Sequence, residues 1–287
     1  MATPADVLEL SPETSRALRW LFTDIDDTLT TDGLLLRGSF DALWRLHDAG
    51  ISVVPVTGRP SGWCDHIARM WPVAAVIGEN GAFCFSYDRS SRRMERSWLL
   101  DEGERAEGRR RLERIRDRVL REVPGAAVAA DQPFRSADLA IDYCEDVAPL
   151  GEAAVSRICE IAREEGASAK VSSIHVNCWF GSYTKSSGVE RFLASREPGG
   201  LDAAQDRIAF CGDSPNDEPM FERLRTSVAV ANIRRFLGSL SHPPRFVTRA
   251  SGGEGFAELA DVLLARRAGQ LPASVVHSRP NGAVPKR

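Results

Sequence analysis

Short, continuous apolar runs are the feature that most limits how this 287-residue chain can fold. They lie at residues 20–22, 53–56, 74–77, 208–210, 228–230 and 246–247, and each ends at polar or glycine-rich residues. Runs this short and unbroken are typical of strands in a parallel sheet that is covered on both faces. Apolar stripes at helical spacing lie between several of them, at 40–47, 189–193 and 220–224. The alternation predicts an α/β fold, with a Rossmann-like parallel sheet and right-handed crossovers.

The middle of the chain has a different pattern. A charged helix is predicted around residues 104–122 and another near 152–165, with alternating segments at 139–143 and 174–179. Two helices and a few strands in this stretch indicate an α+β insertion. Because the core pattern resumes after it, we predict three parts. They are a discontinuous core at 1–87 and 182–268, an inserted cap at 88–181, and a disordered tail at 269–287.

Composition excludes several classes of protein. Hydrophobic residues make up 43% and charged residues 27%, as in ordinary globular enzymes, and the net charge of -3 does not favour nucleic acid. No apolar stretch approaches membrane-spanning length, and the N-terminus lacks the pattern of a signal peptide. The six cysteines have no metal-binding spacing, which indicates free thiols in a reducing compartment. We therefore expect a cytoplasmic protein without nucleic-acid or membrane partners; its oligomeric state stays open.

The strongest chemical signal is a cluster of three carboxylates, Asp24, Asp26 and Asp27, directly after the first apolar run. Open α/β sheets place their ligand sites at the carboxyl ends of strands. Clustered carboxylates repel one another and are costly to bury unless a cation offsets them. Magnesium suits such a cluster, because it takes hard oxygen ligands and keeps waters and substrate phosphates. An acidic turn without a ligand is the alternative interpretation.

Three further segments supply groups that can bind phosphate or complete a metal site. Thr57 and Gly58 follow the second run, where a hydroxyl and free backbone N–H groups can hold a phosphate. Lys185 precedes a predicted helix and offers a cation for phosphate oxygens. Asp213 follows the run at 208–210 and can complete the metal site, with Asp217 bracing it. The turn at Thr57 and the lone lysine are weak signals by themselves, whereas the segment at 208–217 is moderately specific.

Taken in chain order, these segments resemble the haloacid dehalogenase-like superfamily of phosphohydrolases. The sharpest matches are D-x-D-x-T at 24–28 and G-D-S-x-N-D at 212–217. The sequence I-G-E-N-G-A at 77–82, with an insertion before Lys185, is similar to the branch with an α/β cap, subfamily IIB. That branch includes Cof-like enzymes, phosphomannomutases, and phosphatases of sucrose-, trehalose- and mannosyl-type phosphates. Asp27 replaces the usual small residue, so its charge must point away or be neutralised.

The resemblance implies a mechanism through an aspartyl-phosphate. Asp24 would be the nucleophile, and Asp26 the general acid and then the general base. Magnesium would be held by Asp24, the backbone carbonyl of Asp26, and Asp213. The phosphoryl oxygens would be bound by Thr57, Gly58 and Lys185. The residues that would support the metal site from behind are Asp217 and Asn216.

The cap should select the substrate. Ser173, His175 and Asn177 share one face of a predicted strand, because side chains alternate along it. That face can hydrogen-bond sugar hydroxyls if it looks toward the core, and an ordinary half-exposed strand accounts for the pattern equally well. By resemblance, Glu79 and Asn80 would also reach the substrate.

We therefore expect a magnesium-dependent phosphatase that hydrolyses a small phosphate monoester, namely a sugar phosphate. A phosphomutase of the same superfamily needs the same carboxylates and stays an alternative, as does a non-catalytic sugar-phosphate sensor. A signalling receiver domain also combines aspartates, a hydroxyl and a lysine around magnesium. A receiver is much shorter, however, and its acidic pair precedes the phosphoacceptor, so the inserted segment and the late motif at 212–217 argue against it.

Overall fold

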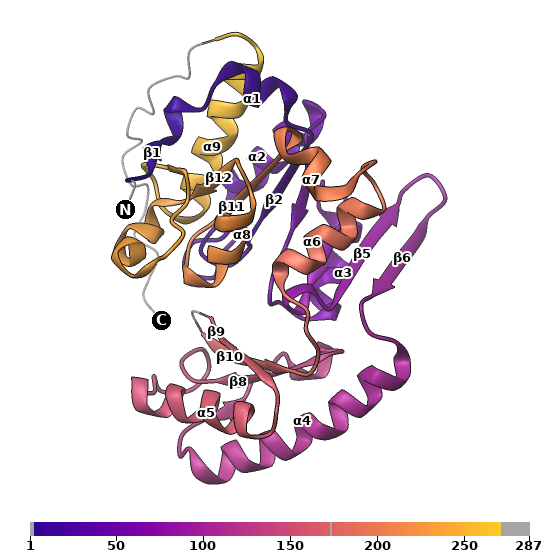
Figure 1. Cartoon of the computed structure of the whole chain (residues 1–287), viewed down its shortest axis with the longest axis vertical. Helices are drawn as coiled ribbons and strands as arrows, with labels where there is room; N and C mark the ends of the chain where they lie inside the picture. The colour runs from indigo at the N-terminus through magenta and orange to yellow at the C-terminus, as the bar shows by residue number, and fades with distance from the viewer. Residues whose placement is uncertain (1–2, 173, 271–287) are drawn as a thin grey trace.

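The computed structural model describes residues 3–172 and 174–270, so Ser173 and most of the predicted tail lie outside the described residues. A parallel sheet in the order β1-β13-β12-β11-β2-β3 forms the core (Figure 1). Its strands are β1 (Ala5–Asp6), β2 (Trp20–Thr23), β3 (Ser52–Pro55), β11 (Ile208–Gly212), β12 (Ser227–Ala229) and β13 (Phe246–Val247). The predicted parallel α/β core is thus confirmed.

Helices cover both faces of this sheet. One face packs on α2 (Arg37–Asp48), α3 (Ser61–Met70) and α9 (Gly252–Arg267), and α1 (Pro12–Ala17) packs against α9. The other face packs on α6 (Lys185–Ala194), α7 (Gly200–Ala204) and α8 (Glu218–Arg223). Along β2, Leu21 faces the first layer, whereas Trp20 and Phe22 face the second. Since both faces are apolar, the strands appear in the sequence as unbroken apolar runs.

A three-stranded antiparallel sheet continues the edge of the core. It consists of β4 (Val76–Gly78), β5 (Phe83–Asp88) and β6 (Arg93–Trp98), and a bridge from Val56 to Ile77 joins it to the region after β3. Strand β6 is not predictable from the apolar pattern of the sequence, because this edge strand is mostly exposed and polar. The boundaries at 88 and 181 stay a prediction; we propose a first boundary near residue 99, because β6 pairs with β5.

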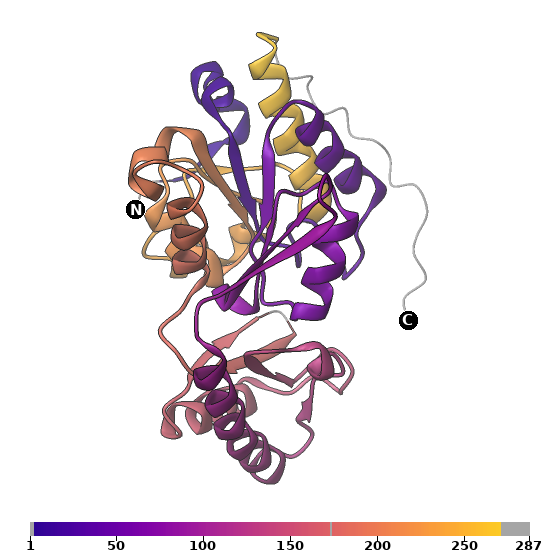
Figure 2. The same cartoon turned by 90° about the vertical axis from the view of Figure 1, so that its right-hand side faces the viewer.

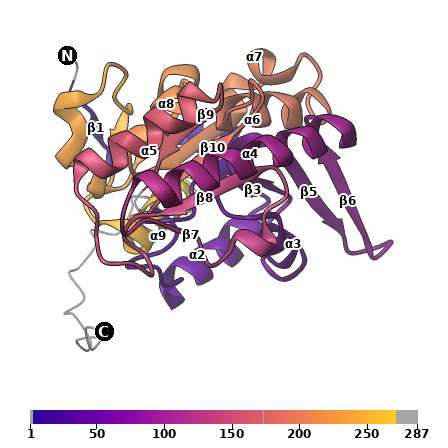
Figure 3. The ribbon, with the colours of Figure 1, turned by 90° about the horizontal axis from the view of Figure 1, so that it is seen from below.

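The inserted segment forms a second body below the core (Figures 1 and 2). Its antiparallel sheet, ordered β7-β8-β10-β9, contains β7 (Ala127–Val128), β8 (Asp138–Asp142), β9 (Ser168–Val171) and β10 (His175–Trp179). Helices α4 (Glu102–Glu122) and α5 (Glu152–Glu164) cover the outer face of that sheet (Figure 3). The inner face, which looks toward the core, carries polar side chains. The inserted segment thus has its own antiparallel sheet, as expected for a cap. Within the described ranges, no helix is long and apolar enough to span a membrane.

Shorter 3-10 segments complete the path of the chain. They are η1 (Val7–Glu9), η2 (Glu79–Gly81), η3 (Gln132–Phe134), η4 (Gln205–Arg207), η5 (Pro215–Asp217) and η6 (Ala231–Ser239). The segment η2 matters most for the arrangement, because it leads out of β4 at the junction of core and cap. Its first residue, Glu79, has a φ of 43° and is fully buried.

The Glu79 carboxylate ties the two bodies together. It accepts hydrogen bonds of 2.6–3.1 Å from the backbone N–H groups of Ser61 in the core and of Ser136, Ala137 and Asp138 in the cap. Nearby, the hydroxyls of Ser61 and Ser136 lie 2.6 Å apart. One acceptor group therefore satisfies buried donors on both sides of the junction, which makes it costly to replace.

We predict that Glu79→Gln lowers the free energy of unfolding by about 2–4 kcal/mol, because an amide –NH₂ would face backbone N–H donors that then lose their acceptor. Thermal and denaturant unfolding of the purified variant measure this loss. The control is Glu113→Gln on the exposed face of α4, which should leave stability unchanged. A Glu79→Gln protein as stable as wild type would show that the junction does not depend on this carboxylate.

Candidate active site

Two neighbouring strands bring the predicted carboxylates together. Asp24 directly follows β2 and Asp213 directly follows β11, and these strands pair in parallel with Cys211 opposite Thr23. Asp217 comes from the turn after β11, and its Oδ2 accepts the backbone N–H of Asp213 at 3.0 Å. All three carboxylates are buried, and one oxygen of each lies within 4.8 Å of the others. The apolar strands therefore end in a compact acidic triad.

Gly212 makes room for this triad. A Cβ atom at Gly212 would overlap the carboxylate of Asp217. Only a residue without a side chain lets that carboxylate fold back against the strand end. The hydroxyl of Thr28 also donates to Oδ1 of Asp213 at 3.3 Å. Gly212 and Thr28 are thus explained by local structure: one leaves room for the carboxylate of Asp217, and the other hydrogen-bonds to that of Asp213.

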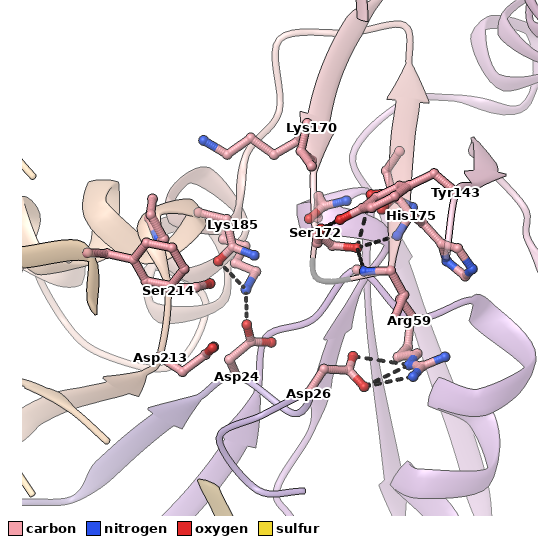
Figure 4. Close-up of a pocket in the computed structure, with 18 of the residues that line it drawn as sticks. Asp24, Asp26, Arg59, Tyr143, Lys170, Ser172, His175, Lys185, Asp213 and Ser214 are labelled. Atoms are coloured by element: carbon pink, nitrogen blue, oxygen red, sulfur yellow. Dashed lines mark hydrogen bonds and ion pairs between the residues drawn. The ribbon is translucent and has the colours of Figure 1, made fainter. Parts of the chain in front are cut away.

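Lys185 supplies the ammonium group of the site. Its Nζ donates to Oδ2 of Asp24 at 2.6 Å and to Oδ1 of Asp217 at 2.9 Å, with 7% of the side chain exposed (Figure 4). Lys185 is the first residue of α6, which begins with Thr184 as a side-chain cap. Gly81 lets this helix start approach η2, because a Cβ there would overlap the carbonyl oxygen of Thr184. Close packing of η2 against the start of α6 thus positions Lys185 beside the triad.

The triad carries more negative charge than Lys185 can offset. Burial raises the pKa of Asp24 to about 7, against the pull of Lys185, with repulsion from Asp217 added. Burial also raises the pKa of Asp213 to about 9, and repulsion from Asp217 and Asp24 adds to it. Three hard oxygen donors with an unmet need for positive charge fit a divalent cation such as magnesium.

Asp26 lies beside the triad rather than within it. Its carboxylate accepts hydrogen bonds of 2.7–3.1 Å from Nε and Nη2 of Arg59, which stacks over Trp63 at 4.5 Å (Figure 4). Sequence analysis did not assign Arg59, although it follows Thr57-Gly58 directly. Asp27, which has a φ of 55°, lines a separate small cavity that it shares with Arg235. A metal contact from the Asp26 carbonyl stays a prediction.

The loop after β3 and the segment η2 contribute different groups to the site. Thr57 is buried, and its hydroxyl accepts the backbone N–H of Arg59 at 3.0 Å. Gly58 and Asn80 line the cavity described below. In the described part of the chain, the buried Nδ2 of Asn80 has no hydrogen-bond partner. Glu79, expected near the substrate, instead points into the junction between core and cap, as described above.

On the cap side, the polar face of β10 does look toward the core. Asn177 and His175 line the cavity, and Nδ2 of Asn177 donates to Asp138 at 3.0 Å. Burial lowers the pKa of His175, against the nearby Glu145, whose Oε2 lies 2.8 Å from Nε2. This placement favours the ligand-facing interpretation of the strand over the half-exposed one. The third predicted residue of that face, Ser173, is not among the described ones.

A second buried arginine, which sequence analysis did not single out, organises the same wall. Arg135 lines the cavity and pairs with Asp131 at 2.9 Å and with Asp138 at 3.0 Å. It also donates to the carbonyl oxygen of Gly58 at 3.0 Å. The cap is therefore attached to the predicted phosphate-binding loop as well as to Glu79.

These groups surround a cavity of about 400 Å³ between core and cap. Asp24, Lys185 and Asp213 form its floor (Figure 4), and Asn216 also lines it, with its Oδ1 3.5 Å from Nζ of Lys185. The size suits a small organic ligand. The arrangement offers a buried carboxylate on the floor with a cation beside it, a second carboxylate at the wall, and polar groups on the cap.

Comparison with known proteins supports the fold of the chain. Residues 21–99 match the family model of haloacid dehalogenase-like hydrolases. No curated protein matches the chain in sequence. The family match confirms the predicted resemblance to this superfamily over residues 21–99. The matched stretch contains Asp24 and Thr57, whereas Lys185 and Asp213 lie outside it.

Solved structures share the fold over most of the chain. A Thermoplasma acidophilum protein covers 86% of this chain and 98% of its own, with a TM-score of 0.67 and 18% identity. A phosphatase of the superfamily from Bacteroides thetaiotaomicron covers 90% and 98%, with a TM-score of 0.59 and 19% identity. The sucrose-phosphatase of Synechocystis sp., solved with sucrose and phosphate, covers 85% and 96%, with a TM-score of 0.59 and 15% identity. At these identities the likeness shows a common fold.

We predict that magnesium stabilises the chelator-treated protein, by about 2.7 kcal/mol at one hundred times the dissociation constant. Asp213→Asn should abolish this gain. It should also stabilise the metal-free protein by about 1 kcal/mol, because asparagine avoids the cost of burying a carboxyl group whose pKa is raised to about 9, while keeping an acceptor for Thr28. Thermal melts with and without magnesium measure both effects, with the exposed Asp146→Asn as the control. A full magnesium response in Asp213→Asn would contradict the site.

Proposed function

We propose that the protein is a magnesium-dependent phosphatase that hydrolyses a small phosphate monoester with a sugar-like alcohol, through a phosphoryl group carried on Asp24. The observation that carries this proposal is the buried carboxylate of Asp24 on the cavity floor, 2.6 Å from the ammonium group of Lys185 and beside Asp213. Support also comes from solved structures of like fold, among them a sucrose-phosphatase and a trehalose-6-phosphate phosphatase related protein.

In the first step, a carboxylate oxygen of Asp24 forms a bond to phosphorus while the ester P–O bond breaks. The leaving alkoxide takes a proton from Asp26. Oδ1 of Asp24 accepts the backbone N–H of Ile25 at 2.8 Å and Oδ2 binds Lys185, so the carboxylate is held in one orientation. Lys185 stays beside the phosphoryl oxygens and offsets their charge.

In the second step, water attacks phosphorus, Asp26 accepts its proton, and inorganic phosphate leaves with the Asp24 carboxylate restored. Arg59 fixes the orientation of Asp26 at the cavity wall through two N–H groups. The buried Nδ2 of Asn80, which lines the cavity, is a donor available for the substrate.

The carboxylates of Asp24 and Asp213 would hold magnesium, together with the backbone carbonyl of Asp26. Bound there, the ion supplies charge neutralisation between the attacking carboxylate and the phosphate dianion. Asp217 is paired with Lys185, so it would support the metal site without being a metal ligand itself. A cytoplasmic location and the absence of nucleic-acid partners remain predictions from composition.

We predict that Asp24→Asn lowers phosphate release from a panel of sugar phosphates at least about 10³-fold, because the amide cannot attack phosphorus. Asp27→Asn is the matched control: it lies in the same turn, outside the triad, and asparagine tolerates its positive φ. This control should keep wild-type release. A colorimetric phosphate assay with magnesium, repeated with chelator, measures both variants.

The same assay separates the alternatives. Phosphate release that needs a bisphosphorylated sugar, with an isomeric sugar phosphate as the main product, would favour the phosphomutase. Binding without release in any reaction would favour the sensor. Full activity in Asp24→Asn would contradict the assignment of the nucleophile, whichever of these reactions the protein performs.

A further inference from the structure

Five lysine and arginine side chains line the cavity, and they divide into two groups: Arg59, Arg135, Lys170, Lys185 and Arg235. Three of them form ion pairs of 2.6–3.0 Å with buried or half-buried carboxylates, as described above. Those three charges are therefore used within the protein. Lys170 and Arg235 make up the second group.

Lys170 has no carboxylate partner within ion-pair distance in the described part of the chain. It lies on β9, opposite Asn177 in the antiparallel register, so its side chain shares the face of the cap sheet that lines the cavity. In Figure 4 the side chain extends from the cap strand toward the side on which Lys185 and Ser214 lie. Its ammonium group is thus held out over the site without a counter-charge.

Arg235 reaches the same cavity from the core. It belongs to η6, which follows β12, and its guanidinium lies 4.6 Å from the ring of Phe236. Burial raises the pKa of Asp27, and the charge of Arg235 opposes this rise. Among residues 3–172 and 174–270, no carboxylate lies within ion-pair distance of Arg235. Core and cap therefore each present one cation without an ion-pair partner to the same space.

The charges of Lys170 and Arg235 favour a particular class of substrate. A phosphate ester with a neutral sugar would place its only anionic group at Asp24 and Lys185, leaving Lys170 and Arg235 without a partner. An alcohol part with its own negative charge would be attracted by both cations and would gain charge-assisted hydrogen bonds. A cavity of about 400 Å³ has room for such a molecule beside the transferred phosphoryl group.

We propose that the substrate carries a second anionic group, a carboxylate or a second phosphate, which is bound between Lys170 of the cap and Arg235 of the core. This proposal rests on the phosphatase function proposed above and narrows its substrate class. The two residues bind and select the substrate, and neither touches the phosphorus atom.

The test compares three ligands with one carbon skeleton. Glucose 6-phosphate has no second anion, 6-phosphogluconate adds a carboxylate, and glucose 1,6-bisphosphate adds a phosphate. Their binding to the Asp24→Asn variant, which cannot turn them over, is measured by calorimetry with magnesium. Lys170→Met and Arg235→Met are added singly to this background. Lys170→Arg keeps the charge, and Arg93→Met removes an exposed cation of β6 that lies away from the cavity.

We expect at least one doubly anionic ligand to bind about tenfold more tightly than glucose 6-phosphate. Lys170→Met and Arg235→Met should each remove most of this preference, whereas Lys170→Arg and Arg93→Met should keep it. The ligand that binds more tightly identifies the second anion as carboxylate or phosphate.

Equal binding of all three ligands, no binding of either doubly anionic ligand, or an unchanged preference in both methionine variants would overturn the proposal. A failure of the phosphatase function looks different. In that case the ligands would bind with the expected preference, but wild-type protein would release no phosphate from any of them. Phosphate release without a charge preference would leave the phosphatase standing and remove only the second anionic group.

Discussion

The contact between the ammonium group of Lys185 and the buried carboxylates of Asp24 and Asp217 is the interaction on which the site depends. Two carboxylates share one cation at 2.6 and 2.9 Å, and Asp213 lies beside them with no lysine of its own. A protein selected only for stability would gain from apolar residues here, because burying charges costs more than pairing them returns. The uncompensated charge therefore supports the proposed function, in which a divalent cation and a phosphate ester would bind here.

The cap completes the cavity because it is fixed to the core at Glu79 and at the loop after β3. Glu79 accepts backbone N–H groups from both bodies, and Arg135 of the cap donates to the carbonyl of Gly58. The polar face of β10 is thereby held above Asp24. In the proposed function, chemistry and selection would thus be divided. The strand ends of the core would provide the reacting groups, and the cap sheet together with η6 would surround the alcohol part of the substrate.

Much of this was predictable from the sequence, for a physical reason. Buried strands with apolar residues on both faces leave unbroken runs, and their carboxyl ends must meet at one edge, so Asp24 and Asp213 were expected together. Polar edge strands such as β6 leave no such pattern. Ion pairs between distant residues, such as Arg59 with Asp26, also leave none. Glu79 was misplaced because a sequence does not show whether a side chain at positive φ turns toward a cavity or into a junction between bodies.

The most direct test of the account is a search for the phosphoryl-enzyme. Wild-type protein is mixed with magnesium and a sugar phosphate that it hydrolyses, and the reaction is quenched in acid within one turnover. The protein is then digested and analysed by mass spectrometry. The account predicts that the peptide containing Asp24 gains the mass of one phosphoryl group, and that the Asp24→Asn protein shows no such gain. Phosphate release without any phosphorylated peptide, or a phosphoryl group on another residue, would contradict the central role of Asp24.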